Sequence, residues 1–190
     1  MSIQERRERE RAEREQLIVT AARELAEAEG WDAVTTRRLA ERVEYSQPVL
    51  YSHFKGKDAI MAAVAVEAFA DMAAELRAAR TAAGDPRAAL AALARAYTDF
   101  AQRRPALYDG MFNQDLDLPF ATPEAPKTLQ AGFDELRQAV RPFAGDDDED
   151  LLAEVLWSGL HGLIILMRGG RLLPGDHERR LALLLRRLTG

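Results

Sequence analysis

The chain has 190 residues, 47% of them hydrophobic and 30% charged, and its formal net charge is −5. It contains no cysteine, which excludes disulfides, thiolate metal sites and thiol nucleophiles and suits a reducing cytoplasm. The amino-terminal stretch lacks the apolar core of a signal peptide, and the longest apolar run, from Leu151 to Met167, contains Glu154 and His161. We therefore expect a soluble, cytoplasmic protein.

The negative charge is distributed unevenly along the chain. Residues 1–57 hold 11 Lys or Arg and 11 Asp or Glu, whereas residues 58–190 hold 15 and 20. This length permits a small domain fused to a larger one, so we expect a neutral domain over residues 1–57 and an acidic one over residues 58–190. Phosphate contacts act locally under salt screening, so a neutral domain binds a polyanion when its basic groups converge on one face.

The elements are all predicted to be helices, because no stretch alternates apolar and polar residues over enough positions to form a strand. Between residues 5 and 15, five arginines alternate with five glutamates, several of them at helical spacing. This pattern fits a solvated, salt-bridged helix extension, and equally an arm that lies along or in a DNA groove. An amphipathic stripe follows, ended by Gly30 with Trp31 after it. The stripe consists of Leu17, Ile18, Ala21, Ala22 and Leu25.

A short helix is predicted to start at Thr35 or Thr36, because either hydroxyl can accept a hydrogen bond from a free backbone N–H of the next turn. Three apolar residues then fall on one face of that helix. They are Leu39, Ala40 and Val43.

A break at Glu44–Tyr45 separates this helix from a second one. Ser46 is its N-cap candidate, and Pro48 lies in the first turn, where a missing N–H costs little. Leu50 and Phe54, four residues apart, are expected to face the first helix. The residues left on the outside are Gln47, Pro48, Tyr51 and Ser52. Two short helices across a turn indicate a helix-turn-helix.

The segments TTRRLA and SQPVLYSHFKGKDAI resemble the tetracycline-repressor (TetR) family. The residues that follow the turn at the family's offsets are Leu50, Tyr51, His53, Phe54, Lys57 and Asp58. The resemblance continues upstream through Gly30 and Trp31, and covers about the first third of the chain. The family usually has Gly where this chain has Glu44, which bears on the geometry of the turn.

The resemblance implies an N-terminal three-helix DNA-binding domain and a larger C-terminal domain for effector binding and dimerisation. From their chemistry, Arg37 suits guanine, Gln47 suits adenine, and Pro48 or Val49 suits a thymine methyl in the major groove. The resemblance implies that Tyr51, His53 and Lys57 hold phosphates. The whole expected DNA-binding set is Thr35, Thr36, Arg37, Ser46, Gln47, Pro48, Val49, Tyr51, His53 and Lys57.

Further helices are predicted over residues 57–83, 87–103, 107–112 and 128–142, separated by Gly, Asp and Pro residues. The long 57–83 helix suggests a connector between the domains. Residues 113–126 contain three prolines and two aspartates, a composition typical of a loop that forms a lid or stays mobile.

The run Gly145–Asp150 precedes a strongly apolar helix over residues 151–167. Because EF-hand spacing is missing, we interpret its carboxylates as complementing the helix N-terminus rather than holding calcium. Ser158 and Gly162 would let a partner helix approach closely. With a last helix over residues 177–188, this helix predicts a homodimer through a four-helix bundle. The expected interface is Leu160, Leu163, Ile164, Leu181 and Leu185.

An effector site is predicted among the aromatic and Met side chains of the C-terminal domain. Any single one of these is more often plain core, and His161 is more often a satisfied core or interface histidine. WSGLHGLIIL also resembles the Trp-His-Gly signature of one TetR C-terminal subgroup. The candidate ligand-binding residues are Tyr97, Phe100, Met111, Phe112, Phe133, Trp157 and His161.

Two functions compete at this point. One is a DNA-binding transcriptional regulator, most often a repressor, that binds a palindromic operator as a dimer and is released by a small apolar or aromatic ligand. The other is an all-α interaction module that uses the helix-turn-helix for protein contacts. We expect no enzyme, cofactor or metal site, because helical Glu-x-x-His pairs, Gly-rich phosphate loops and G-x-S-x-G are missing from the sequence.

Overall fold

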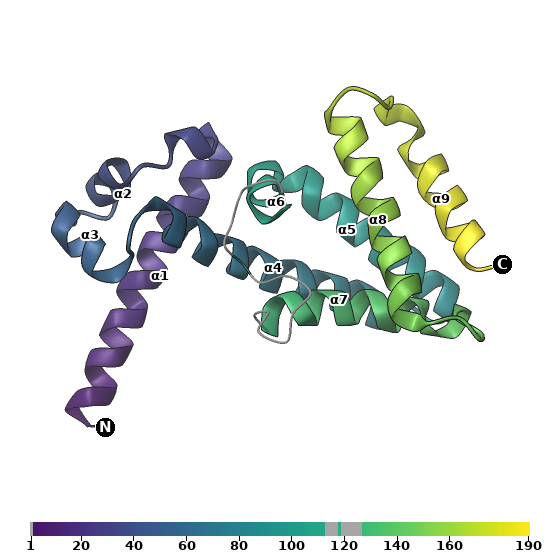
Figure 1. Ribbon diagram of the computed structural model, residues 1–190, viewed down its shortest axis with the longest axis horizontal. Coiled ribbons are helices and arrows are strands. Elements are labelled where there is room, and N and C mark those ends of the chain that lie inside the picture. Colours follow the sequence, from purple (N-terminus) through teal and green to yellow (C-terminus); the bar gives the residue numbers. More distant parts are fainter. Residues whose placement is uncertain (1, 113–117, 119–126) are drawn as a thin grey trace. The chain divides into compact units, whose positions relative to one another are not determined.

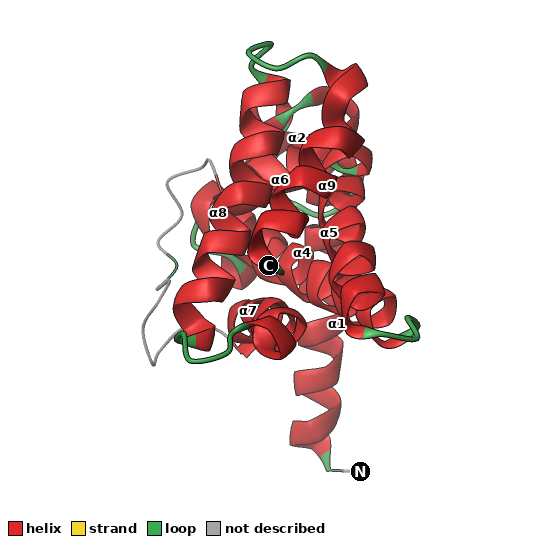
Figure 2. Cartoon of the chain, turned by 90° about the vertical axis from the view of Figure 1, so that its right-hand side faces the viewer, coloured by secondary structure: helices red, strands yellow, loops and turns green. Residues whose placement is uncertain are grey.

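The computed structural model describes residues 2–112, 118 and 127–190. In this part of the chain nine α-helices and three short 3-10 helices follow one another (Figure 1), and none of the described residues forms a strand (Figure 2). The all-α prediction is confirmed. The predicted loop over residues 113–126 lies outside the described residues, apart from residue 118.

The chain divides into two compact units. Unit 1 contains residues up to Ala68 together with a segment that starts at Arg104, and unit 2 contains Phe69–Arg103 together with the rest of the chain. Helix α4 (Lys57–Thr81) therefore begins in one unit and ends in the other. This division differs from the expected boundary after Lys57, because twelve or so residues of α4 and the later helix α6 pack with the N-terminal helices.

Unit 1 is built from α1 (Ile3–Glu29), the 3-10 turn η1 (Trp31–Ala33), α2 (Thr36–Arg42), α3 (Gln47–His53), the start of α4 and α6 (Pro105–Phe112). Helix α1 ends where Gly30 adopts a φ of 83°, a conformation that favours glycine. Its buried stripe includes Val19 in place of Leu17, which is 47% exposed. The other fully buried large side chains of the unit include Ile18, Leu25, Leu39, Leu50 and Ile60.

Unit 2 contains the end of α4, α5 (Pro86–Arg103), α7 (Lys127–Val140), η2 (Arg141–Phe143), α8 (Glu149–Arg168), η3 (Pro174–Asp176) and α9 (His177–Leu188). Helix α5 contacts α7, α8 and α9, and α7 also packs along α8. These contacts enclose a core of large side chains. Its members include Leu76, Leu90, Leu93, Tyr97, Phe100, Leu136, Leu156 and Leu160.

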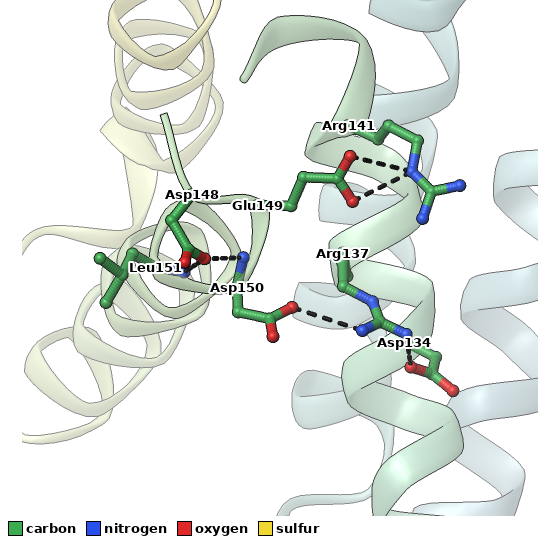
Figure 3. A network of polar contacts seen from close by, with 7 residues as sticks. All are labelled: Asp134, Arg137, Arg141, Asp148, Glu149, Asp150 and Leu151. Carbon is green, nitrogen blue, oxygen red and sulfur yellow. Dashed lines mark hydrogen bonds and ion pairs between the residues drawn. The ribbon is translucent and has the colours of Figure 1, made fainter. Parts of the chain in front are cut away.

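The acidic run before α8 acts as a helix cap. The carboxylate of Asp148 accepts hydrogen bonds from the backbone N–H of Asp150 at 2.8 Å and of Leu151 at 3.2 Å (Figure 3). Glu149 adds a negative charge to the first turn, where the helix dipole stabilises it. The interpretation of this run as a complement to the helix N-terminus is thus confirmed.

Two arginines, Arg137 in the last turn of α7 and Arg141 at the start of η2, form ion pairs with the start of α8 (Figure 3). Arg137 binds Asp134 at 2.6 Å on its own helix and reaches Asp150 at 3.5 Å. Arg141 binds Glu149 at 3.0 Å. These ion pairs therefore join the first turn of α8 to the last turn of α7 and to η2.

By length and composition alone, α8 is apolar enough to cross a membrane, with a mean hydropathy of 1.5. The core helix of a soluble protein has the same composition, so this is weak evidence for a membrane span.

Candidate nucleic-acid interface

The turn between α2 and α3 is closed by a Schellman motif. Glu44 has a φ of 57°, which is the left-handed conformation usually taken by glycine. The backbone N–H of Tyr45 donates to the carbonyl of Ala40 at 2.9 Å, and that of Glu44 to the carbonyl of Glu41 at 3.4 Å. These two hydrogen bonds satisfy carbonyls at the end of α2, so the turn forms with Glu in the place of Gly.

The two helices start as the sequence predicts, with one difference. Thr35 caps α2, because its hydroxyl accepts from the backbone N–H of Arg38 at 3.3 Å. Ser46 occupies the N-cap of α3 but makes no capping hydrogen bond with its side chain. Pro48 lies in the first turn of α3, where its fixed φ is compatible with the helix. The Ser46 hydroxyl therefore does not cap α3.

The outer face of α3 presents the side chains expected to read bases. Gln47 and Pro48 are exposed, Val49 is 39% exposed and Tyr51 is 51% exposed. Leu50, on the opposite side, is fully buried and fixes which face points outward. The exposed residues are not required for packing, so they are available to a partner.

Helix α2 adds two side chains beside this face. The Thr36 hydroxyl lies 3.4 Å from the Tyr51 hydroxyl, which links the two helices. Arg37 is highly exposed, and among the described residues its ion pair is with Glu41, one turn later, at 3.0 Å. An exposed pair of this kind contributes less than about 1 kcal/mol, so the guanidinium can exchange Glu41 for another acceptor.

Two of the expected phosphate ligands are engaged within unit 1. The His53 side chain is only 7% exposed, and its Nδ1 lies 3.5 Å from a carboxylate oxygen of Glu15 in α1. The Lys57 ammonium donates to the carbonyl of Trp31 at 2.9 Å. An ammonium has three N–H donors, so Lys57 keeps two for other acceptors. Tyr51 is the phosphate candidate with the most exposed side chain of the three.

Ion pairs hold α2 against α1 and so fix the position of the helix-turn-helix. Arg38 binds Glu29 with two hydrogen bonds of 2.9 and 2.7 Å, and Arg42 binds Glu24 at 2.7 Å. The hydrogen bonds between Arg38 and Glu29 lower the pKa of Glu29 and raise the pKa of Arg38. Both pairs are bonded through planar guanidinium groups, which favours a defined geometry.

Helix α6, which the sequence assigns to the C-terminal domain, is bonded to the helix-turn-helix unit. The Trp31 indole N–H donates to the carbonyl of Ala106 at 2.6 Å, and the Glu27 carboxylate accepts from the backbone N–H of Leu107 at 2.8 Å. A Cβ on Gly110 would lie 2.4 Å from the Trp31 ring, so only glycine permits this approach. These contacts join residues far apart in sequence, so no local sequence pattern predicts them.

The candidate ligand-binding residues are divided between the two units. Met111 and Phe112 belong to α6 in unit 1, where the Phe112 ring packs 4.8 Å from that of Tyr108. The others lie in unit 2. These are Tyr97, Phe100, Phe133, Trp157 and His161.

Within unit 2, two of these residues are hydrogen-bonded to each other and a third follows on the same helix. The indole N–H of Trp157 donates to the hydroxyl of Tyr97 at 2.9 Å, and Tyr97 is fully buried in the core. His161 follows one turn after Trp157 on α8, and burial lowers the pKa of its imidazole. Burial therefore favours the neutral imidazole. The hydrogen bond from Trp157 to Tyr97 joins α8 to α5.

Two pockets in unit 2 lie away from this group. One, of about 300 Å³, is lined by the end of α4, the start of α5 and the end of α7, and includes Arg80, Pro86 and Gln138. The other, of about 310 Å³, lies between α5 and α9 and includes Leu90 and Leu181. Neither is lined by any of the candidate ligand-binding residues.

The expectation that the predicted dimer residues lie on the surface is wrong for three of the five. Leu160, Ile164 and Leu181 are at most 2% exposed in the single chain, because α8 and α9 pack them into the core of unit 2. Leu163 and Leu185 are half-buried.

A different apolar stripe of α8 faces solvent. Leu151 is 61% exposed, Val155 55% and Leu166 41%. With Ser158 and Gly162 they fall at spacings of 4, 3, 4 and 4 residues, which places all five on one helix face. A Cβ on Gly162 would meet no atom within 4 Å, so this face is open at that position. The term α8 stripe refers to these five residues below.

Two known protein families match different parts of the chain. Residues 18–64 match the family described as bacterial regulatory proteins, tetR family, and residues 90–188, just over half of the chain, match the tetracyclin repressor-like C-terminal domain.

Individual relatives agree with these family matches. The HTH-type transcriptional regulator YobS of Bacillus subtilis is 34% identical over 102 residues, which cover 50% of this chain and 49% of that protein. The class D tetracycline repressor protein of Escherichia coli is 45% identical over 53 residues, 28% of this chain and 24% of that protein. The chain thus aligns with about half or less of the length of these two relatives.

A solved structure from Rhodococcus sp. RHA1 superposes with a TM-score of 0.77 at 25% identity. The superposition covers 92% of both chains. Its protein is described as having unknown function.

Proposed function

Because the chain belongs to the TetR family of bacterial regulatory proteins, we propose that it is a DNA-binding transcriptional repressor that reads an operator with α2 and α3. The observation that carries this proposal is the outer face of α3. Its exposed side chains are Gln47, Pro48, Val49 and Tyr51, which contribute little to packing, and α2 adds the exposed Arg37. A helix presented in this way fits the major groove, which is wide enough to admit it.

Each exposed side chain has a specific partner on DNA. Arg37 can bind guanine O6 and N7 with two hydrogen bonds, and Gln47 can bind adenine in the same manner. Pro48 and Val49 offer apolar contact to a thymine methyl. Tyr51 can donate to a phosphate, and so can Lys57 with the N–H groups that Trp31 leaves free. A good bidentate base contact contributes about 1–3 kcal/mol of discrimination.

The test is to select bound duplexes from a random pool and measure the operator affinity as a function of salt. We expect a palindromic sequence, and an affinity that falls log-linearly as the salt concentration rises. Arg37→Ala should relax the preference at one base pair in each half-site. Lys57→Ala should instead weaken binding to all sequences alike and reduce the salt slope by about one per subunit.

Arg95→Ala is the matched control, because Arg95 is an exposed arginine of unit 2 whose ion pair is with Glu178. It should leave both the sequence preference and the slope unchanged. Identical behaviour of Arg37→Ala and Lys57→Ala would show that bases and phosphates are assigned wrongly. Selection of no sequence, with no salt dependence, would instead favour a protein-interaction module.

We further propose that the regulator is a homodimer whose subunits meet along the α8 stripe. The stripe is the largest exposed apolar feature of α8, and its Ser158 and Gly162 are small enough for a second helix to approach closely. A two-fold dimer presents two reading helices, which agrees with a palindromic operator.

A small apolar or aromatic effector is proposed to act through unit 2, at the group formed by Tyr97, Trp157 and His161. The support is chemical: two aromatic rings and a neutral imidazole offer apolar surface with a few polar atoms, as ligand sites do. Helix α4 is proposed to transmit the effect to the DNA-binding helices, because it begins with Lys57 in unit 1 and continues into unit 2 with Arg77 and Arg80.

A further inference from the structure

We propose that the first turns of α1, residues 3–14, form a rigid helical arm that binds the phosphate backbone of DNA flanking each half-site through Arg7 and Arg14. This inference rests on the proposed DNA-binding function and extends it to base pairs that α2 and α3 do not reach. The term α1 arm refers to residues 3–14 below.

The α1 arm is a continuation of a folded helix. Ser2 and Glu5 form a capping box, in which the Ser2 hydroxyl accepts from the Glu5 N–H at 3.1 Å and the Glu5 carboxylate accepts from the Ser2 N–H at 2.7 Å. Every residue of the arm is exposed. In Figure 1 this half of α1 projects past α2 and α3, all within unit 1. The arm therefore presents its side chains in fixed directions.

The glutamates of this region are all occupied by internal partners. Glu10, Glu13 and Glu15 each bind the arginine four residues before them, at 3.6, 3.6 and 2.8 Å. Glu5 belongs to the capping box, and Glu8 accepts from the Gln4 amide at 2.6 Å. Three of these carboxylates are thus paired with arginines, and the other two accept hydrogen bonds from neutral N–H groups.

Two arginines remain after this pairing. Within the part of the chain that the structure describes, Arg7 and Arg14 form no ion pair or side-chain hydrogen bond, whereas Arg6, Arg9 and Arg11 are bound to glutamates. The arm has five arginines and four glutamates, a formal net charge of +1, and Arg7 and Arg14 are the arginines whose charges it leaves without a carboxylate partner.

Helical periodicity fixes the side of the arm on which these charges lie. Arg7, Arg11 and Arg14 are spaced by 4 and 3 residues, and the same row continues after 4, 4 and 3 more residues. The continuing members are Ile18, Ala22 and Leu25, all buried in the core of unit 1. The two free arginines thus point to the side of α1 on which the rest of the unit packs.

The arm leaves the unit beside the end of α3. The Glu15 carboxylate, at the base of the arm, lies 3.5 Å from His53, the last residue of α3. The row of arginines begins there and leads away from the reading helix. If α3 lies in the major groove, the next negative charges on that side are the phosphates of the flanking DNA.

The dimensions agree with this placement. Arg7 and Arg14 are separated by a helix rise of about 10 Å, which corresponds to about three base pairs of B-DNA. The twelve residues of the arm extend about 18 Å, or about five base pairs. The contact should therefore involve base pairs just outside each half-site.

The experiment compares two double variants on two duplexes. One duplex carries the selected operator with about ten flanking base pairs on each side, and the other ends at the half-sites. Arg7→Ala with Arg14→Ala should reduce the salt slope on the long duplex by about 0.9 for each lost phosphate contact, hence about 3.6 for a dimer. On the trimmed duplex it should have no effect. Alanine is the best helix former, so circular dichroism should show that the arm stays helical.

The matched control is Arg6→Ala with Arg9→Ala, which removes the same number of arginines from outside the row of Arg7, Arg11 and Arg14. It should leave the slope on the long duplex within about half a unit of the wild-type value. Equal losses from both double variants, or a loss that persists on the trimmed duplex, would overturn the arm contact while the proposed function stands. A wild-type protein that binds neither duplex would overturn both.

Discussion

Glu44 shows how a single residue tolerates a conformation that suits glycine. Its φ of 57° brings Cβ close to the following carbonyl, at a cost of about 1–2 kcal/mol for an L-residue. The Schellman hydrogen bonds from Glu44 and Tyr45 to the end of α2 offset that cost. The turn is therefore specified by α2 and α3 on either side of it, and Glu44 adopts the angle that they require.

We predict that Glu44→Gly changes the free energy of unfolding by less than about 1 kcal/mol, because relief of the strain is partly cancelled by the greater freedom of glycine in the unfolded chain. Glu44→Val should destabilise by about 1–2 kcal/mol, since a β-branched residue is least suited to this angle.

Urea unfolding monitored by circular dichroism measures both changes. Glu41→Val is the control, because Glu41 is exposed and lies within α2, where valine costs at most about 0.7 kcal/mol. Equal effects of Val at positions 41 and 44 would show that the angle of Glu44 stores no strain.

The junction of α4 with α7 depends on one buried carboxylate. Glu135 of α7 is completely buried, and its two oxygens accept from Arg77 at 2.7 Å and Arg80 at 2.8 Å, both on α4. Arg80 also donates to Gln138 at 2.8 Å. The hydrogen bond to Glu135 raises the pKa of Arg77. Two planar guanidinium groups on one carboxylate fix the register of the two helices.

We predict that Glu135→Ala lowers the free energy of unfolding by about 3–5 kcal/mol, because it removes the carboxylate that Arg77 and Arg80 share and leaves a buried hole. Gln138→Ala is the control, since it removes a partner of Arg80 at an exposed position and should cost less than about 1 kcal/mol. Thermal or urea unfolding gives both values, and a cost for Glu135→Ala no larger than the control would contradict the role of the carboxylate.

Helix α6 illustrates a second element whose position depends on distant residues. Its backbone is bonded to Trp31 and Glu27, and Gly110 lets the Trp31 ring approach it closely. Pro105 and the apolar residues of the segment account for the helix itself. Its place in unit 1 follows from contacts with residues 75 to 80 positions earlier.

At the scale of the assembled molecule, the α8 stripe leads to a test of dimerisation. We predict that Val155→Arg yields a monomer that remains folded and binds operator weakly, because the charge falls on an exposed position at the middle of the proposed interface. Sedimentation at micromolar concentration measures the mass, and a gel shift measures the binding.

Leu160→Arg serves as the contrast. Leu160 is fully buried within unit 2, so an arginine there should unfold the unit instead of separating subunits. A wild-type protein that sediments as a monomer, or a Val155→Arg variant that sediments as a dimer, would remove the α8 stripe as the interface.

We also predict that a ligand of unit 2 and the operator affect each other's binding equally. A compound that favours the non-binding conformation by ~3 kcal/mol should weaken operator binding by up to about 150-fold, and saturating operator should weaken the compound's binding by the same factor. Calorimetric titrations with and without operator measure both factors.

Trp157→Phe locates the ligand. It removes the indole N–H that binds Tyr97, so it should change ligand affinity while leaving ligand-free operator binding intact. If every compound that binds unit 2 leaves operator affinity unchanged, the protein is a constitutive DNA binder.

Most helix limits could be predicted from the sequence because they depend on neighbours within a few residues. Gly30 ends α1, Thr35 caps α2, and Asp148 caps α8, as their chemistry requires. The outer face of α3 was equally predictable, since burial of Leu50 fixes the direction of Gln47 and Tyr51 by helical periodicity.

The tertiary structure decided which of several apolar faces became core. Helix α8 is apolar on too many sides for its sequence to distinguish Leu160, which packs inside unit 2, from Val155, which faces solvent. Only contacts with α5, α7 and α9 make that choice, and they join residues distant in sequence. The same holds for Lys57, whose bond to Trp31 no local pattern reveals. Capping and periodicity act over one or two turns, whereas burial depends on the whole set of elements that surround a side chain.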